Sequence, residues 1–384
     1  MKKKIIVLGA VFFAVTIACW FQSPSAFSQS ERRQLAQFPE ISAETVINGQ
    51  FASEFESYSQ DQFPLREQFR SLKAVMEYGA FRKKDQHDLY LKDGYVAQIL
   101  YPLSEKSVSH ATERFRAVYE KYLSASARDG RIFASVIPDK GYYMAADGGW
   151  PALDYERLFE MVSSEMDYAR YVDLTDALER EDYYKTDSHW RQEKLGDAVT
   201  VLGEAMGIGG DLTGPEEMDM ETAAEDFRGV YFGQTALPLP GEPLRYMTFP
   251  ELEECKAYNY ETRETSGVYQ LDKLKKTEKL DKTEKTDKQE VRDPYDIFLG
   301  GACALITVEN PSARAAGTDR ELIMFRDSFG SSIAPLLLPA YSRITLVDLR
   351  YLSSDYLDQF IDFHGQDVLF LYSAAMLNDS YTLK

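Results

Sequence analysis

Most of the chain alternates between two hydrophobic patterns. Short apolar runs rich in β-branched and aromatic residues are typical of strands buried on both faces. These predicted strands are Ile132–Ile137, Tyr171–Leu174, Leu322–Phe325, Ile344–Val347 and Val368–Tyr372. Other segments carry apolar residues at helical spacing. The predicted helices are 111–125, 153–168, 190–206, 330–338 and 353–362. Alternating strands and helices predict an α/β fold, a three-layer sandwich in which helices cover both faces of a mainly parallel sheet.

The region 28–95 has a different character and is predicted to be a helical stem that packs on the core. Apolar residues recur at helical spacing over 51–81, and Pro64 interrupts them. Since proline ends or kinks a helix, we expect two helices or a helix and a turn. The stretch 89–99 is predicted to begin the sheet, with an Asp-Gly hairpin turn at 93–94.

A long stretch from about 208 to 294 breaks the alternation of strands and helices. It is acidic at 216–226, rich in Gly and Pro at 229–244, and of low complexity from Lys273 to Lys288. Such charge-rich runs are usually solvated helices or loops. We therefore predict one α/β domain over 96–384 that this exposed insertion interrupts.

The first 27 residues are predicted to be a signal peptide or signal anchor. Three lysines precede a 17-residue apolar run, Ile5 to Phe21, which is the pattern of an export signal. Pro24-Ser25-Ala26 is a weak cleavage site, and Thr16-Ile17-Ala18-Cys19 is a weak lipidation motif. The run is just long enough to remain as a membrane anchor. All three fates place the rest of the chain outside the cytoplasm, secreted or anchored in the cell envelope.

Composition narrows the possible partners. The 43 basic and 62 acidic residues give a formal net charge of -19, which argues against nucleic acid because phosphate binding favours a basic surface. A hydrophobic content of 44% is enough for a sizeable core.

Besides Cys19, only Cys255 and Cys303 remain, and outside the cytoplasm they could form one disulfide or stay as two thiols.

Two short segments could carry chemistry. Lys185–Trp190 supplies an acid and an imidazole, Asp187 and His189, two residues apart. Phe325–Gly330 supplies Ser328 where a strand should turn into a helix. Together they offer a Ser-His-Asp site in which the histidine deprotonates the serine and the aspartate orients the imidazole.

The predicted strands place several polar residues at one edge of the sheet. In an open α/β sheet, sites form beyond the carboxyl ends of the strands. Ser328, the Asp187/His189 pair, Lys140 and Arg350 each follow a predicted strand, so we expect them to gather there. Backbone N–H groups where the next helix starts, including that of Gly330, are candidate oxyanion donors.

Simpler interpretations compete with the catalytic one. Asp-x-His also suits a surface turn in which Thr186 or Asp187 caps a helix, and Asp-Ser-Phe also suits a helix cap. In the simpler interpretation, Lys140 and Arg350 are solvated side chains with no role in the site. Trp190 is then a core residue and does not serve as a platform for a sugar. Two ligands from Asp-x-His could start a zinc site, but no second histidine motif completes it. We predict no metal and no cofactor.

The motifs, taken in order, resemble the DHHW family of bacterial exported proteins, a branch of the SGNH-hydrolase-like proteins that include the alginate O-acetylation enzymes. The matching blocks are Glu31–Leu35 with Phe38-Pro39, Tyr58 with Asp61–Arg66, Tyr183–Trp190, Asp293–Tyr295 with Phe298–Gly301, Phe325–Phe329, and Ile344 with Asp348–Tyr351. The blocks span most of the chain, and their combination in this order is specific.

This resemblance implies a permuted SGNH-like sheet with Asp187, His189 and Ser328 as the catalytic triad. The implied activity is acyl transfer or ester hydrolysis, with acetyl groups on a cell-surface or cell-wall polysaccharide as the target. Ser328 would carry the acyl group. A glycan substrate and a membrane acyl-donor protein are the implied partners.

Two departures from the family pattern bear on activity. Ser188 replaces the first histidine of the name-giving motif, while the histidine expected to work is retained. Ala302 follows Gly301 where an oxyanion-holding Asn is expected. Losing one oxyanion donor costs on the order of a hundredfold in rate, which leaves Gly301 and the backbone near Ser328 as donors. The alternative is a non-catalytic polysaccharide-binding or assembly protein that keeps the fold.

Overall fold

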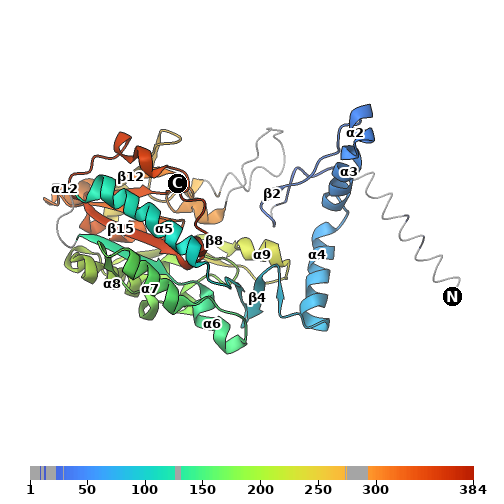
Figure 1. Ribbon diagram of the computed structural model, residues 1–384, viewed down its shortest axis with the longest axis horizontal. Coiled ribbons are helices and arrows are strands. Elements are labelled where there is room, and N and C mark those ends of the chain that lie inside the picture. The colour runs from blue at the N-terminus through green and yellow to red at the C-terminus, as the bar shows by residue number, and fades with distance from the viewer. Residues whose placement is uncertain are drawn as a thin grey trace. The chain divides into compact units, whose positions relative to one another are not determined.

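A computed structural model describes residues 23–28, 30–125, 131–272, 274 and 293–384, together with Gly9 and Phe13 (Figure 1). The predicted export signal at 5–21 and most of the low-complexity run at 273–288 lie outside the described residues. Among the helices that are described, none has the length and apolar character needed to cross a membrane.

The chain forms two compact units. Of the described residues, the smaller contains those up to His87 and Val230–Leu239, and the larger contains those of 88–229, 240–274 and 293–384. In the smaller unit the helices are α2 (Ala43–Ile47), α3 (Gln50–Asp61), α4 (Arg66–Val75) and α9 (Val230–Thr235). The break between α3 and α4 contains Pro64, as its position in the sequence predicts.

An eight-stranded sheet forms the centre of the larger unit, in the order β11-β10-β12-β14-β13-β15-β6-β7. Five strands run parallel: β6 (Ile132–Ile137), β7 (Arg170–Tyr171), β13 (Glu321–Arg326), β14 (Arg343–Val347) and β15 (Asp367–Ser373). Three are antiparallel to their neighbours: β10 (Lys256–Asn259), β11 (Glu264–Ser266) and β12 (Leu305–Glu309). The predicted mainly parallel α/β sheet is thus confirmed.

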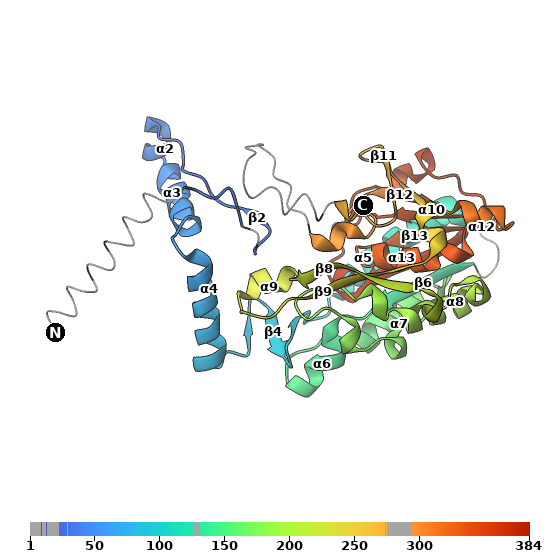
Figure 2. The same ribbon diagram turned by 180° about the vertical axis from the view of Figure 1, so that it is seen from behind.

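Helices cover both faces of this sheet. Helices α5 (Glu105–Val118) and α7 (Tyr155–Glu165) pack on one face, and α8 (Gly196–Met206) and α13 (Gly330–Leu337) pack on the other. Figure 1 shows α5 in front of the sheet, and Figure 2 shows α13 in front of it from behind. A hydrophobic core lies on each face of the sheet, and strand β15 contributes side chains to both because its alternate residues point to opposite faces. The molecule therefore has the predicted three layers.

Local signals explain where the helices begin. Ser104 accepts a hydrogen bond from the N–H of Ser107 and caps α5, and Asp154 caps α7 by accepting from Arg157. Helix α5 therefore begins six residues before the predicted start at 111. The predicted helix at 353–362 is a short 3₁₀ segment, Ser354–Gln359.

Two predictions about strands need correction. The stretch 89–99 forms a hairpin, β4 (Leu89–Lys92) and β5 (Tyr95–Gln98), with its turn at the predicted place. This hairpin lies outside the eight-stranded sheet instead of beginning it, because β6 is flanked there by β15 and β7. The stretch 208–294 is not wholly an excursion, since it supplies β10 and β11 to the sheet edge and a ribbon of β8 (Asp219–Phe227) and β9 (Glu242–Thr248).

Cys255 and Cys303 are buried free thiols. Strands β10 and β12 pair antiparallel, with Lys256 opposite Glu309 and Asn259 opposite Ile306. The two cysteines therefore lie at opposite ends of this pairing. Several strand residues separate them, each adding about 3.3 Å along the strand. A disulfide requires Cα atoms no more than about 7 Å apart, so the two cannot be joined. Of the two alternatives left by the sequence, the fold adopts the unpaired one.

Candidate active site

The three side chains predicted to form a triad meet in the structure. His189 Nε2 lies 2.7 Å from Ser328 Oγ, and His189 Nδ1 lies 2.6 Å from Asp187 Oδ1. Asp187 Oδ1 also accepts a hydrogen bond from the backbone N–H of His189 at 3.0 Å. This is the connectivity that lets an aspartate orient an imidazole and the imidazole accept a proton from a serine.

Ser328 is presented by the turn between β13 and α13. The neighbouring Asp327 builds this turn, because its Oδ1 accepts from the N–H of Phe329 at 3.1 Å and its Oδ2 accepts from the N–H of Ser373 at 2.8 Å. Gly330 lets the first turn of α13 lie directly on the preceding strand, since a Cβ there would come within 2.6 Å of Arg326 Cβ. Ser328 itself remains partly exposed.

Asp187 and His189 lie on a short loop closed at its base. Tyr183 and Trp190 form an antiparallel bridge, and the N–H of Tyr184 donates to the carbonyl oxygen of His189 at 3.1 Å. The loop therefore holds its acid and its base in fixed relative positions without being a helix or strand.

Aromatic rings enclose the imidazole of His189. Tyr295 stacks on it with centroids 4.0 Å apart and planes 14° apart, and Phe329 lies 4.9 Å away. The His189 side chain is 13% exposed, whereas the Asp187 side chain is fully buried. The three side chains thus run from a buried carboxylate to a partly exposed hydroxyl.

The environment of His189 favours its protonated form. Burial lowers the pKa of this imidazole, but the charge of Asp187 and the hydrogen bond to it, with smaller contributions from Asp293 and Asp327, raise the pKa by more. The net result is a pKa above the ordinary value of 6.5. An imidazolium that forms when His189 accepts the serine proton is therefore stabilised.

Ser332 links the residues around the imidazole, and sequence reasoning missed it. Its Oγ accepts hydrogen bonds from Trp190 Nε1 at 2.7 Å and from the hydroxyl of Tyr295 at 2.8 Å. The amide of Gln192 donates to its carbonyl oxygen at 2.6 Å. Trp190 is therefore a fully buried core residue that fixes the loop and offers no sugar platform. Tyr295, which stacks on His189, was also missed. Its position in a sequence block that resembles the DHHW pattern is the signal that could have pointed to it.

Lys140 and Arg350 lie at the predicted edge, each with partners inside the protein. Lys140 Nζ donates to the carbonyl oxygens of Tyr184 at 2.8 Å and Asp187 at 2.7 Å. Arg350 forms a bidentate ion pair with the buried Asp348, through its Nε at 2.9 Å and its Nη2 at 2.6 Å. Both side chains therefore support the loops of the site in this structure.

The predicted glycine donors are also engaged within the chain. The N–H of Gly301 donates to the carbonyl oxygen of Phe298 at 3.2 Å, and that of Gly330 to Asp327 at 3.2 Å. Among the described residues, the N–H of Ser328 has no hydrogen-bond acceptor. The Ser328 amide is thus the backbone donor that this geometry offers to an oxyanion. Ala302 is exposed and contributes no polar side chain.

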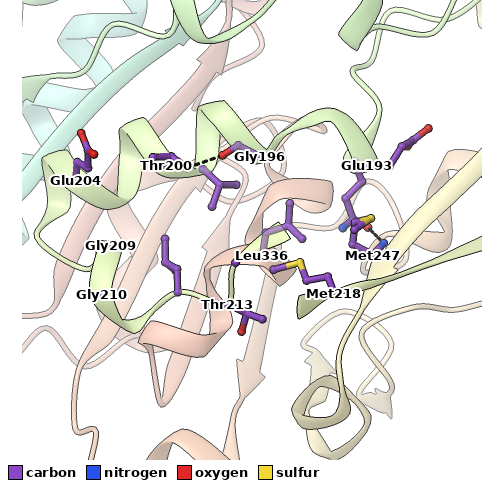
Figure 3. Close-up of a pocket in the computed structure, with 14 residues that line it drawn as sticks. Glu193, Gly196, Thr200, Glu204, Gly209, Gly210, Thr213, Met218, Met247 and Leu336 are labelled. Atoms are coloured by element: carbon purple, nitrogen blue, oxygen red, sulfur yellow. Dashed lines mark hydrogen bonds between the residues drawn. The ribbon is translucent and has the colours of Figure 1, made fainter. Parts of the chain in front are cut away.

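A pocket of about 360 Å³ is lined by Gln192 but not by Ser328 or His189. Figure 3 shows Met218, Met247 and Leu336 around this pocket. It is a mainly apolar space next to the scaffold of the site and does not contain the reacting groups. Within the described residues, no group of three or more His, Cys, Asp or Glu side chains could hold a metal ion.

Comparison with solved structures finds the same fold in proteins of low sequence identity. A DHHW family protein from Eubacterium siraeum shares 17% identity, with a TM-score of 0.54 over 77% of this chain and 96% of that chain. Bacillus cereus PatB1, in a structure with a sulfonyl adduct, shares 13% identity, with a TM-score of 0.56 over 75% of this chain and 97% of that chain. No protein-family model matches the sequence, and no curated protein is similar to it. The predicted resemblance to the DHHW family is confirmed at the level of the fold.

Proposed function

We propose that this protein is an acyl-transfer enzyme with Ser328 as nucleophile. The observation that carries the proposal is the continuous chain of contacts from Asp187 through His189 to Ser328, with distances of 2.6 and 2.7 Å. A hydroxyl in such contact with an imidazole is activated for attack on an ester carbonyl. The chain also has the fold of a DHHW family protein, the family whose resemblance in the sequence implies acyl transfer.

The reaction follows from the positions of the three groups. His189 Nε2 accepts the proton of Ser328 Oγ as this oxygen attacks the carbonyl carbon. The tetrahedral oxyanion is stabilised by the N–H of Ser328, and its collapse expels the alcohol, which takes the proton from His189. Water or a sugar hydroxyl then loses a proton to His189 and attacks the acyl-serine. Collapse of this second intermediate expels Ser328 Oγ, which takes the proton back from His189 and completes either hydrolysis or transfer.

The finer form of the proposal is an exported carbohydrate O-acetyltransferase or acetylesterase. Its target would be acetyl groups on a cell-surface or cell-wall polysaccharide, and a membrane acyl-donor protein would be a partner of the transferase form. The export pattern at the N-terminus and the sequence resemblance to the DHHW family support this form. The same pattern supports secretion into, or anchoring in, the bacterial cell envelope.

A non-catalytic polysaccharide-binding or assembly role is the second candidate. Ala302 favours it, because an exposed methyl group stands where the family pattern has an oxyanion donor. The intact contacts of Asp187, His189 and Ser328 favour the enzyme instead, since a binding protein has no need of them.

Hydrolysis of p-nitrophenyl acetate by the purified protein distinguishes the two candidates. The enzyme proposal predicts turnover that Ser328→Ala and His189→Ala each remove, with both variants still folded by circular dichroism. Background hydrolysis that neither substitution changes would reject the enzyme and support the binding role. If turnover is found, sugar acceptors added to the assay would show whether transfer competes with hydrolysis.

A further inference from the structure

Lys140 holds the loop that carries the acid and the base of the site. It is the first residue of α6 (Lys140–Gly148), directly beyond β6, and only 2% of the residue is exposed. Its Nζ lies 2.8 Å from the carbonyl oxygen of Tyr184, 2.7 Å from that of Asp187 and 3.4 Å from that of Lys185. Three carbonyl groups of one short loop thus converge on one amine.

The loop depends on such a donor because it lacks regular structure. The residues between Tyr183 and Trp190 belong to no helix or strand, and backbone N–H groups pair with only some of their carbonyl groups: Val96 donates to Lys185 at 2.7 Å and Tyr184 to His189 at 3.1 Å. A buried carbonyl without a partner costs about 1–3 kcal/mol. Lys140 supplies the partner for Asp187, whose side chain is the one that orients His189.

The charges around Lys140 allow it to stay in place. The pKa of Lys140 is lowered to about 7: burial is the main cause and the nearby Arg191 adds to it, while the carboxylates of Asp187, Glu242 and Asp139 oppose it in part. Near neutral pH the amine is therefore divided between its charged and neutral forms. The charged amine has three N–H donors for the three carbonyl groups, and the neutral amine keeps two, enough for the two shorter contacts with Tyr184 and Asp187.

We propose that Lys140 is a positioning residue of the acyl-transfer site, and that its amine fixes the backbone of Asp187 so that the carboxylate stays aligned with His189. This inference rests on the proposed function. It differs from the sequence prediction of a substrate or oxyanion contact, because Nζ faces the inner side of the loop. Misplacement of a reacting group by about 1 Å can reduce the rate on the order of a hundredfold.

The test compares Lys140→Met and Lys140→Gln with a matched control, Lys92→Met. Lys92, on β4, also donates from its Nζ to a backbone carbonyl, that of Met144 at 3.3 Å, which is not part of the loop. We expect Lys140→Met to reduce kcat for p-nitrophenyl acetate on the order of 10- to 100-fold with little change in KM. Lys140→Gln keeps N–H donors and should lose less, and Lys92→Met should keep the wild-type kcat.

A second readout does not depend on turnover. The proton shared by His189 Nδ1 and Asp187 should give a far-downfield proton NMR signal, assigned by its absence in His189→Ala. We expect Lys140→Met to shift or broaden this signal, and Lys92→Met to leave it unchanged. If Lys140→Met does not fold, Lys140→Gln decides by the same two measurements.

The outcomes separate this inference from the proposed function. A folded Lys140→Met protein with the wild-type signal and kcat would overturn the positioning role. Wild-type protein that shows the signal but hydrolyses no ester would reject the proposed function, while the effect of Lys140→Met on the signal would still support or reject the role of Lys140.

Discussion

Replacing Asp187 with Asn tests the geometry of the site without changing its shape. Asp187 is fully buried, and its Oδ1 accepts from His189 Nδ1 at 2.6 Å and from the His189 amide at 3.0 Å. In Asp187→Asn, the amide oxygen can keep both of these contacts, but the negative charge that stabilises a His189 imidazolium is removed. His189 Nε2, which faces Ser328 Oγ at 2.7 Å, would then be a weaker base for the serine proton, because the imidazolium that forms is no longer paired with a carboxylate.

The expected loss of rate is large. Losing the carboxylate charge should cost about 10²- to 10⁴-fold, or about 2.7 to 5.5 kcal/mol of transition-state stabilisation, the upper figure being the loss when an aspartate-to-asparagine change in a serine triad also selects the wrong tautomer. A second effect follows from the pKa. The Asp187 carboxylate opposes the effect of burial on His189, so its removal should lower the pKa of His189 and move the acid limb of any residual activity to lower pH.

The assay is kcat/KM for p-nitrophenyl acetate measured across pH, with Asp327→Asn as the matched control. Asp327 adjoins Ser328, but its carboxylate accepts from the backbone of Phe329 and Ser373 and has no hydrogen bond to His189. The control should lose about 1–3 kcal/mol of stability. Its loss of activity should be much smaller than that of Asp187→Asn. Asp187→Asn activity within tenfold of wild type, with an unmoved acid limb, would refute this reasoning.

Three further predictions follow from the same contacts. Burial lowers the pKa of His189 but its carboxylate neighbours raise it by more, so the acid limb of wild-type kcat/KM should lie above pH 6.5, as a pH titration of activity would show. Ser332→Ala leaves the buried Trp190 indole N–H without its acceptor, whereas the Tyr295 hydroxyl keeps the carbonyl oxygen of Trp190, so the change should cost about 1–3 kcal/mol in urea unfolding. Ser331→Ala, which removes a buried hydroxyl that has no partner in the described structure, should be close to neutral. Thiol titration of the unfolded protein without reductant should find that both Cys255 and Cys303 react as thiols. If neither of them reacts, the fold is contradicted.

Much of the parallel sheet could be predicted because its strands are buried on both faces. Such strands are continuous apolar runs, and Ile132–Ile137 is predicted with the bounds that β6 has in the structure. The approach of Ser328 to His189 could also be predicted, because residues that follow parallel strands must gather at one edge. No distance was needed for this inference, only the order of strands and polar residues.

The remaining features depend on contacts that periodicity does not encode. The antiparallel edge strands β10 and β12 are short, and β10 lies in a stretch whose composition suggests a solvated insertion. The role of Ser332 cannot be seen in the sequence, since its neighbour Ser331 has the same chemistry and no partner. The role of Lys140 likewise depends on which way the loop carbonyls point, which only the folded backbone determines.

Covalent labelling tests the central claim most directly. The wild-type protein should be treated with phenylmethylsulfonyl fluoride, which modifies activated serine hydroxyls, and the modified peptide identified by mass spectrometry. The account predicts one sulfonyl group on Ser328, no label in Ser328→Ala, and much slower labelling in His189→Ala because the base is lost. Labelling of other serines at equal rates, or equal labelling of Ser328 with and without His189, would contradict the claim that this triad activates Ser328.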